Sequence, residues 1–122
     1  MHGDRGIERF RQDLEGDRRL VTSVVVEGEL KFGINRLAPG KKRQRLNDVL
    51  EQVLIRLHDI IPVERSTNYY YAELKSDLWS RGLPMGDNDM WIAATALEHD
   101  LTLLTRDSHF RGVAGLVIEG WK

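Results

Sequence analysis

The chain has 122 residues, with 18 Lys and Arg against 19 Asp and Glu, and a net charge of −1. This length fits one domain. The net charge excludes a strongly basic nucleic-acid clamp over the whole chain. The absence of cysteine excludes disulfides and thiolate metal sites. No apolar run approaches the ~18 residues of a membrane span, and Met1–Gly6 lacks the hydrophobic stretch of a signal peptide. We therefore expect a cytoplasmic protein that has no membrane partner.

The hydrophobic pattern switches repeatedly between the period of a helix and short strand-like runs. In chain order, we predict helix 7–14, strand 20–23, helix 26–37, helix 46–57, strand 60–63, helix 70–78, helix 90–97, strand 101–105 and strand 116–118. Ser66 or Thr67 can cap the helix that follows strand 60–63, and Asp87 or Asn88 can cap the next helix. Strands that alternate with helices favour an α/β fold with a parallel sheet.

Three acidic residues stand close to the ends of predicted strands. Asp107 lies two residues after strand 101–105, Asp89 begins the helix before that strand, and Glu29 lies in the helix after the first strand. Sites in open parallel sheets form beyond the carboxyl ends of the strands. Carboxylates brought together there would hold a hard divalent cation such as Mg²⁺ or Mn²⁺.

Each of these acids also has a structural explanation. Asp87 and Asp89 can be helix caps, each worth about 1 kcal/mol, and Asp107 can cap a short turn that follows it. Glu29 lies beside the apolar stripe of its helix, where an unpaired carboxylate is costly to bury, so it faces either a cleft or a cation. The four histidines are scattered without metal-ligand spacing, and we interpret them as surface or packing residues.

Three segments carry longer motifs: TSVVVEGELKFGI at 22–34, GLPMGDNDMWIAATA at 82–96 and LLTRDSHF at 103–110. They resemble, in order and spacing, motifs of PIN-domain toxins of the VapC type, and the FitB branch in particular. The resemblance implies a three-layer fold with a parallel sheet flanked by helices. It also implies a metal-dependent ribonuclease that is the toxin of a type II toxin–antitoxin pair. RNA as substrate, a cognate antitoxin and a homodimer are the partners that it implies.

The resemblance also assigns roles to single residues. Carried over by motif, Glu29, Asp89 and Asp107 are the active-site acids and the ligands of Mg²⁺ or Mn²⁺. Thr105 matches a small hydroxyl residue near the site, and Asp87 lies beside the motif acid as a supporting residue. The implied reaction is metal-assisted attack of water on a phosphodiester, which displaces the 3′-oxygen and leaves a 5′-phosphate.

A basic cluster precedes the apolar stripe of helix 46–57. It consists of Lys41, Lys42, Arg43 and Arg45. These side chains can contact RNA phosphates, or they can form the solvated start of a helix. Cations at a helix N-terminus oppose the helix dipole, so helix stability does not account for them.

The sequence departs from the family pattern at its start. PIN domains begin with a strand that ends in an aspartate, whereas Asp4 follows no strand. Apolar side chains on such a strand contribute ~1.5–3 kcal/mol each, against a total stability of ~5–15 kcal/mol. We therefore expect residues 1–122 to form a single PIN-like domain that is N-terminally incomplete and lacks the first strand. The alternative function is an interaction module that binds an antitoxin or dimerises without cleaving RNA, with Trp79 and Trp91 among its candidate interface residues.

Overall fold

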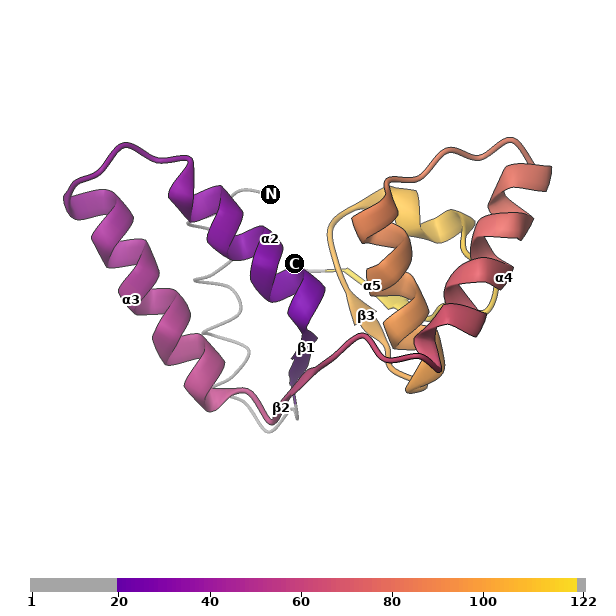
Figure 1. Ribbon diagram of the computed structural model, residues 1–122, viewed down its shortest axis with the longest axis horizontal. Helices are drawn as coiled ribbons and strands as arrows, with labels where there is room; N and C mark the ends of the chain where they lie inside the picture. The colour runs from indigo at the N-terminus through magenta and orange to yellow at the C-terminus, as the bar shows by residue number, and fades with distance from the viewer. Residues whose placement is uncertain (1–19, 121–122) are drawn as a thin grey trace. The chain divides into compact units, whose positions relative to one another are not determined.

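The computed structural model describes residues 20–120, whose helices and strands are drawn in Figure 1. The elements are β1 (Val21–Ser23), α2 (Val24–Asn35), α3 (Lys41–Arg56), β2 (Asp59–Ile61), α4 (Thr67–Ser80), α5 (Asp87–Glu98), β3 (Leu103–Leu104), the 3₁₀ helix η1 (Ser108–Gly112) and β4 (Ile118–Glu119). They form two compact units, divided between Pro62 and Val63. The predicted helix 7–14 lies outside the described residues. No helix within 20–120 is long and apolar enough to cross a membrane.

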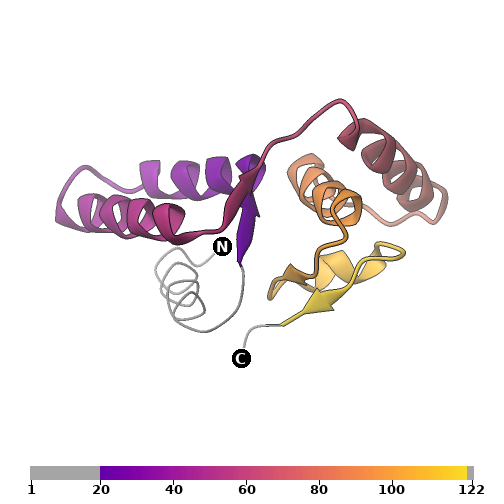
Figure 2. The same cartoon turned by 90° about the horizontal axis from the view of Figure 1, so that it is seen from below.

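The first unit combines a parallel strand pair with a helical hairpin. β1 pairs with β2, with Ser23 opposite Ile61. Ser23 also caps α2, because its Oγ accepts the N–H of Val26 at 3.1 Å. The strand therefore passes into the helix without a loop. Figures 1 and 2 show α2 and α3 side by side, and their facing sides supply most of the core residues of this unit: Ile34, Leu46, Leu50, Val53 and Leu57.

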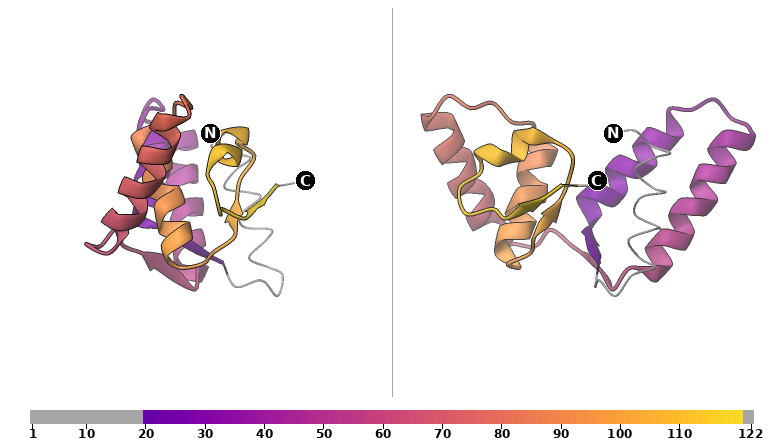
Figure 3. Two further views of the ribbon diagram at one scale, coloured as in Figure 1. Left: turned by 90° about the vertical axis from the view of Figure 1, so that its right-hand side faces the viewer. Right: turned by 180° about the vertical axis from the view of Figure 1, so that it is seen from behind.

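The second unit is built around α5. Figures 2 and 3 show this helix between α4 and the segment of β3, η1 and β4. Its buried residues are mostly small, which allows close packing on both sides: Met90, Ile92, Ala93, Ala94, Thr95 and Ala96. β3 and β4 pair in parallel, with Leu103 opposite Ile118.

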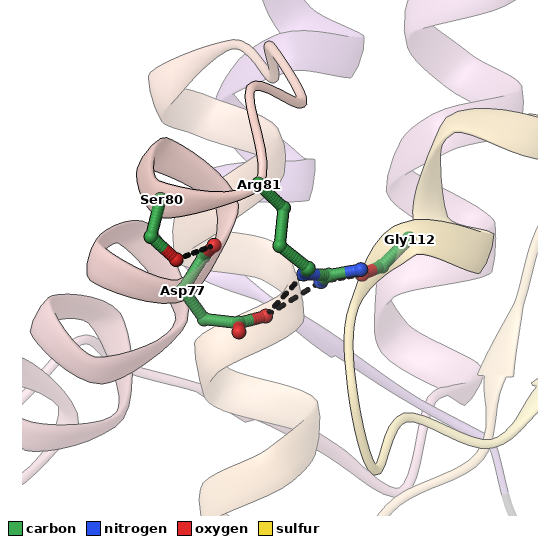
Figure 4. A network of polar contacts seen from close by, with 4 residues as sticks. All are labelled: Asp77, Ser80, Arg81 and Gly112. Carbon is green, nitrogen blue, oxygen red and sulfur yellow. Dashed lines mark hydrogen bonds and ion pairs between the residues drawn. The ribbon is translucent and has the colours of Figure 1, made fainter.

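A polar network fastens the end of α4 to η1 (Figure 4). The guanidinium of Arg81 donates to the carboxylate of Asp77 and to the carbonyl oxygen of Gly112. Ser80 Oγ donates to the carbonyl oxygen of Asp77 at 2.8 Å. Arg81 thus connects the end of α4 to Gly112 in η1, which lies 31 positions later in the sequence.

The alternation of helices with parallel strands is confirmed, but most boundaries differ from the prediction by a few residues, and α3, α4 and α5 each begin earlier than predicted. Strand 101–105 is reduced to β3, because the N–H of Leu101 bonds to the carbonyl of Ala96 at 2.8 Å and closes the end of α5. Asp100, with φ of 54°, makes the turn there. The last strand begins only at Ile118, because the N–H of Leu116 bonds to the carbonyl of Val113 in a turn. The helix predicted over 26–37 ends at Asn35.

Candidate active site

Asp107 caps η1 and forms a small cluster with two neighbours. Its Oδ1 accepts the backbone N–H of His109 at 2.9 Å and lies 2.6 Å from Nδ1 of that histidine. The N–H of Asp107 donates to Thr105 Oγ1 at 3.0 Å. The capping explanation is therefore correct for Asp107. The side chain is still 41% exposed, and both contacts use Oδ1, so capping is compatible with a ligand role for Oδ2.

His109 is the residue of this cluster that the sequence analysis passed over. Its exposure agrees with the interpretation as a surface histidine, but its ring contacts a candidate catalytic acid. The spacing Asp107-Ser108-His109 could have indicated this contact, because a short side chain at the N-terminus of a 3₁₀ helix accepts the N–H of the residue two positions ahead. His109 holds Asp107 by both its backbone and its imidazole.

Asp87 and Asp89 lie in the first turn of α5, but neither is its N-cap. Gly86 occupies that position and supplies no side-chain hydrogen bond, so the predicted cap at Asp87 or Asn88 is wrong. The reason is that Gly86 has an extended backbone with ψ of 151°, and the helix begins directly after it. Carboxylates in the first turn are favoured by the helix dipole. Asp89 is half-buried in this position.

Asp87 contacts α4. Its Oδ1 accepts the hydroxyl of Tyr71 at 2.9 Å and lies 3.5 Å from Lys75 Nζ, which also donates to the Tyr71 oxygen at 3.1 Å. The hydrogen bond from Tyr71, and then the charge of Lys75, hold the pKa of Asp87 below its ordinary value. The Tyr71 ring stacks on Trp91, with 3.8 Å between the centroids. These contacts connect Asp87 to α4.

Glu29 lies in the second turn of α2, in the first unit. It is half-buried, so its carboxylate is only partly removed from water. The nearby Lys31 pairs with Glu27 instead. Within residues 20–120 the Glu29 side chain makes no hydrogen bond or ion pair, and its role as a metal ligand stays a prediction.

The candidate acids are divided between the two units. Asp89 and Asp107 belong to the second unit, as does Thr105, whereas Glu29 belongs to the first. In the part of the chain that the structure describes, no three His, Asp or Glu side chains are grouped so that they could hold a metal ion. The donor chemistry nevertheless suits Mg²⁺ or Mn²⁺, because carboxylate and hydroxyl oxygens are hard ligands. The metal site stays a prediction.

The basic cluster occupies the first turns of α3, as expected. It consists of Lys41, Lys42, Arg43 and Arg45, and the first turn of this helix holds no acidic residue. Arg43 Nη2 donates to Asn35 Oδ1 at 3.2 Å, which connects the start of α3 to the end of α2. Contact of these cations with RNA stays a prediction.

Comparison with known proteins gives a consistent result. Residues 1–116 match the PIN domain family. Ribonuclease VapC2 of Rickettsia felis is 31% identical over 109 residues, which are 88% of this chain and 78% of that protein. Toxin FitB of Neisseria gonorrhoeae is 35% identical over 88 residues, or 70% of this chain and 63% of its own length.

A solved structure supports the same assignment. The crystal structure of VapBC2 from Rickettsia felis, bound to a DNA fragment from their promoter, matches with a TM-score of 0.77 and 31% identity. The match covers 87% of this chain and 77% of that chain. The arrangement of parallel strands and helices around α5 is thus part of a PIN-domain fold, with helices around a sheet. On the family match and these identities, the chain belongs to the PIN-domain family.

Proposed function

We propose that this protein is the toxin of a toxin–antitoxin pair and acts as an endoribonuclease that hydrolyses phosphodiester bonds of RNA. The similarity to Ribonuclease VapC2 and to Toxin FitB supports both parts of the proposal. The observation that carries it is the placement of two motif acids in one compact unit. Asp89 lies in the first turn of α5, and Asp107 caps η1 shortly after the end of β3.

The proposed site uses Glu29, Asp89 and Asp107 as oxygen ligands. A bound Mg²⁺ or Mn²⁺ would supply charge stabilisation at the scissile phosphate and a more acidic water. Thr105 accepts the backbone N–H of Asp107 and so holds the main chain there, whereas His109 contacts Oδ1 and limits the rotation of the carboxylate. Hydrolysis that displaces the 3′-oxygen leaves a 5′-phosphate on the product.

A pair of variants in one helical turn tests the proposal. Asp89→Asn should lower cleavage of an end-labelled RNA by at least about 100-fold, because even residues that only support a metal ligand are worth 10–100-fold. Asp87→Asn is the comparison within the same turn: because Asp87 bonds Tyr71 and Lys75, its replacement should lower cleavage far less than Asp89→Asn. Cleavage should require added Mg²⁺ or Mn²⁺ and stop with a chelator. Undiminished cleavage by Asp89→Asn would contradict the assignment.

The proposed function also implies binding partners for this chain. The similarity to the VapBC2 complex supports an antitoxin that binds this chain. A homodimer stays a prediction, with Trp79 and Tyr69 as exposed candidates at 83% and 72%. Trp91 is a weaker candidate because it stacks on Tyr71. The cytoplasm is the location that we propose, since both the RNA and an antitoxin must reach the protein.

The interaction module that binds without cleaving is the alternative function. The names of the related proteins favour the nuclease, and the same cleavage assay decides between the two. Metal-dependent cleavage that Asp89→Asn abolishes supports the enzyme. No cleavage by the wild-type chain in either metal would support the module.

A further inference from the structure

The end of the α2–α3 hairpin is strongly positive in a chain whose net charge is −1. Residues 32–47 contain no Asp or Glu, and their basic residues are Arg36, Lys41, Lys42, Arg43 and Arg45; Lys31, just before them, pairs with Glu27. Figure 1 shows that the loop between the two helices lies at the end of the hairpin opposite β1 and β2. Arg43 connects the two helices there through the neutral side chain of Asn35, a contact that leaves its positive charge in place.

An exposed aromatic ring lies within this basic stretch. Phe32 is 64% exposed, and the guanidinium carbon of Arg36 lies 5.8 Å from its ring centroid. Full burial of such a side chain would contribute about 1.5–3 kcal/mol to stability. The same helix buries Ile34 in the core, so Phe32 is on a different face. Core packing therefore does not explain a phenylalanine at this position.

We propose that Phe32 is a stacking platform for an unpaired RNA base, and that Lys41 and Lys42 bind the flanking phosphates. Single-stranded RNA is recognised by aromatic rings and guanidinium planes that stack on bases, within a positively charged surface. Phe32 and Arg36 supply both kinds of stacking group, one helical turn apart. An acidic protein segment would pair its carboxylates with the cations alone. An RNA strand would use the cations for its phosphates and the ring for a base. The inference rests on the proposed function only in taking RNA as the substrate.

Binding is measured separately from cleavage, in the full chain carrying Asp89→Asn. The probes are a labelled single-stranded RNA of roughly a dozen nucleotides and the same ribose–phosphate chain without bases. Phe32→Ala should weaken binding to the RNA by about fivefold or more, the effect of losing one stacked base. It should leave binding to the base-free chain unchanged. Phe32→Trp should restore RNA binding, because a larger ring stacks at least as well.

The phosphate contacts have their own signature. Lys41→Gln should weaken binding to both probes, and the slope of log K against log salt should fall by about 0.7 for the one lost phosphate contact. Phe32→Ala should leave that slope unchanged. Arg56→Gln, at the other end of α3, is the matched control and should change neither quantity. Circular dichroism melts of each variant check that folding is intact.

Three results would overturn the inference. In the first, Phe32→Ala binds the RNA as tightly as its parent. In the second, it weakens both probes equally, so that no base is involved. In the third, Lys41→Gln leaves the salt dependence of RNA binding unchanged, so that no phosphate contact is lost. None of these results bears on the cleavage test at Asp89, so the two proposals fail separately.

Discussion

Thr67 donates its hydroxyl hydrogen to Oε1 of Glu98 at 2.7 Å and joins the first turn of α4 to the last turn of α5. The same hydroxyl oxygen accepts the N–H of Glu64 at 3.0 Å. Thr67 is completely buried, and the Glu98 side chain is only 10% exposed. A buried carboxylate of this kind depends on its hydrogen bonds, so this contact is a fixed point of the second unit.

Replacing Thr67 by Val should therefore destabilise the protein. The change keeps the shape of the side chain but removes one hydrogen bond to the Glu98 carboxylate and the acceptor of the Glu64 N–H. A loss of about 1–3 kcal/mol is expected from urea unfolding curves. Thr67→Ser keeps the hydroxyl and should lose less. The exposed Thr102→Val is the matched control, and a loss at Thr102 as large as that at Thr67 would contradict this account.

The same carboxylate makes stability depend on pH. Hydrogen bonds from Ser66 and Thr67, opposed by burial and assisted by His99, lower the pKa of Glu98 below its ordinary 4.5. A lowered folded-state pKa stabilises the protein above the unfolded value, and this stabilisation is lost as pH falls through the folded value.

Melting temperatures between about pH 7 and pH 3 measure this loss, because the ordinary carboxyl pKa lies within that interval. Glu98→Gln should melt at a lower temperature than wild type at neutral pH, and the difference should shrink in acid. The exposed Glu73→Gln should follow the wild-type curve, because it leaves the contacts of Glu98 intact. A constant difference across the whole interval would contradict the assignment.

Local patterns in the sequence predicted those parts of the fold that depend on neighbours along the chain. The apolar stripe of α3 correctly indicated that Leu46, Leu50 and Val53 form a core, because helical periodicity alone puts them on one face. The short length of β3 was missed, because it depends on how α5 ends at Asp100 and Leu101. The sequence predicted a cap at Asp87, whereas its side chain bonds Tyr71, which lies 16 positions away and is not visible to a local pattern.

The residues of the candidate site also fall into those that local patterns indicated and those that depend on the folded structure. The motifs indicated Asp89 and Asp107 from their places beside a helix start and a strand end. In the structure Asp89 lies in the first turn of α5, whereas Asp107 caps η1 after a strand that ends earlier than predicted. The contact between Asp107 and His109 depends on the 3₁₀ turn of η1, which propensity alone does not specify. Phe32 carried no signal in its helical pattern, because its exposure depends on which faces of α2 are buried.

The bond from Tyr71 should control the ionisation of Asp87. Tyr71→Phe removes the hydroxyl that contributes most to the low pKa of this carboxyl, so the pKa of Asp87 should rise toward its ordinary value. The titration can be followed by carbon NMR of the side-chain carboxyl. Lys75→Met should also raise it. Tyr69→Phe is the matched control because Tyr69 is 72% exposed, and an unchanged Asp87 pKa in Tyr71→Phe would rule out the contact.

Arg81 should control how often η1 opens. Its guanidinium holds the carbonyl of Gly112 at one end of η1, while Asp107 caps the other end. Loss of one such hydrogen bond, worth about 1 kcal/mol, should raise the rate of local opening about fivefold. Amide hydrogen exchange of Val113, whose N–H bonds to the carbonyl of Phe110, reports this opening.

Two comparisons make the Arg81 measurement specific. Arg81→Ala should accelerate exchange at Val113 but not in α3, which belongs to the other unit. Arg111→Ala removes an exposed arginine from η1 itself and should have little effect. If Arg111→Ala accelerates exchange as much as Arg81→Ala, the stabilisation comes from the local charge of η1. An effect confined to Arg81→Ala shows that α4 holds the segment that carries Asp107.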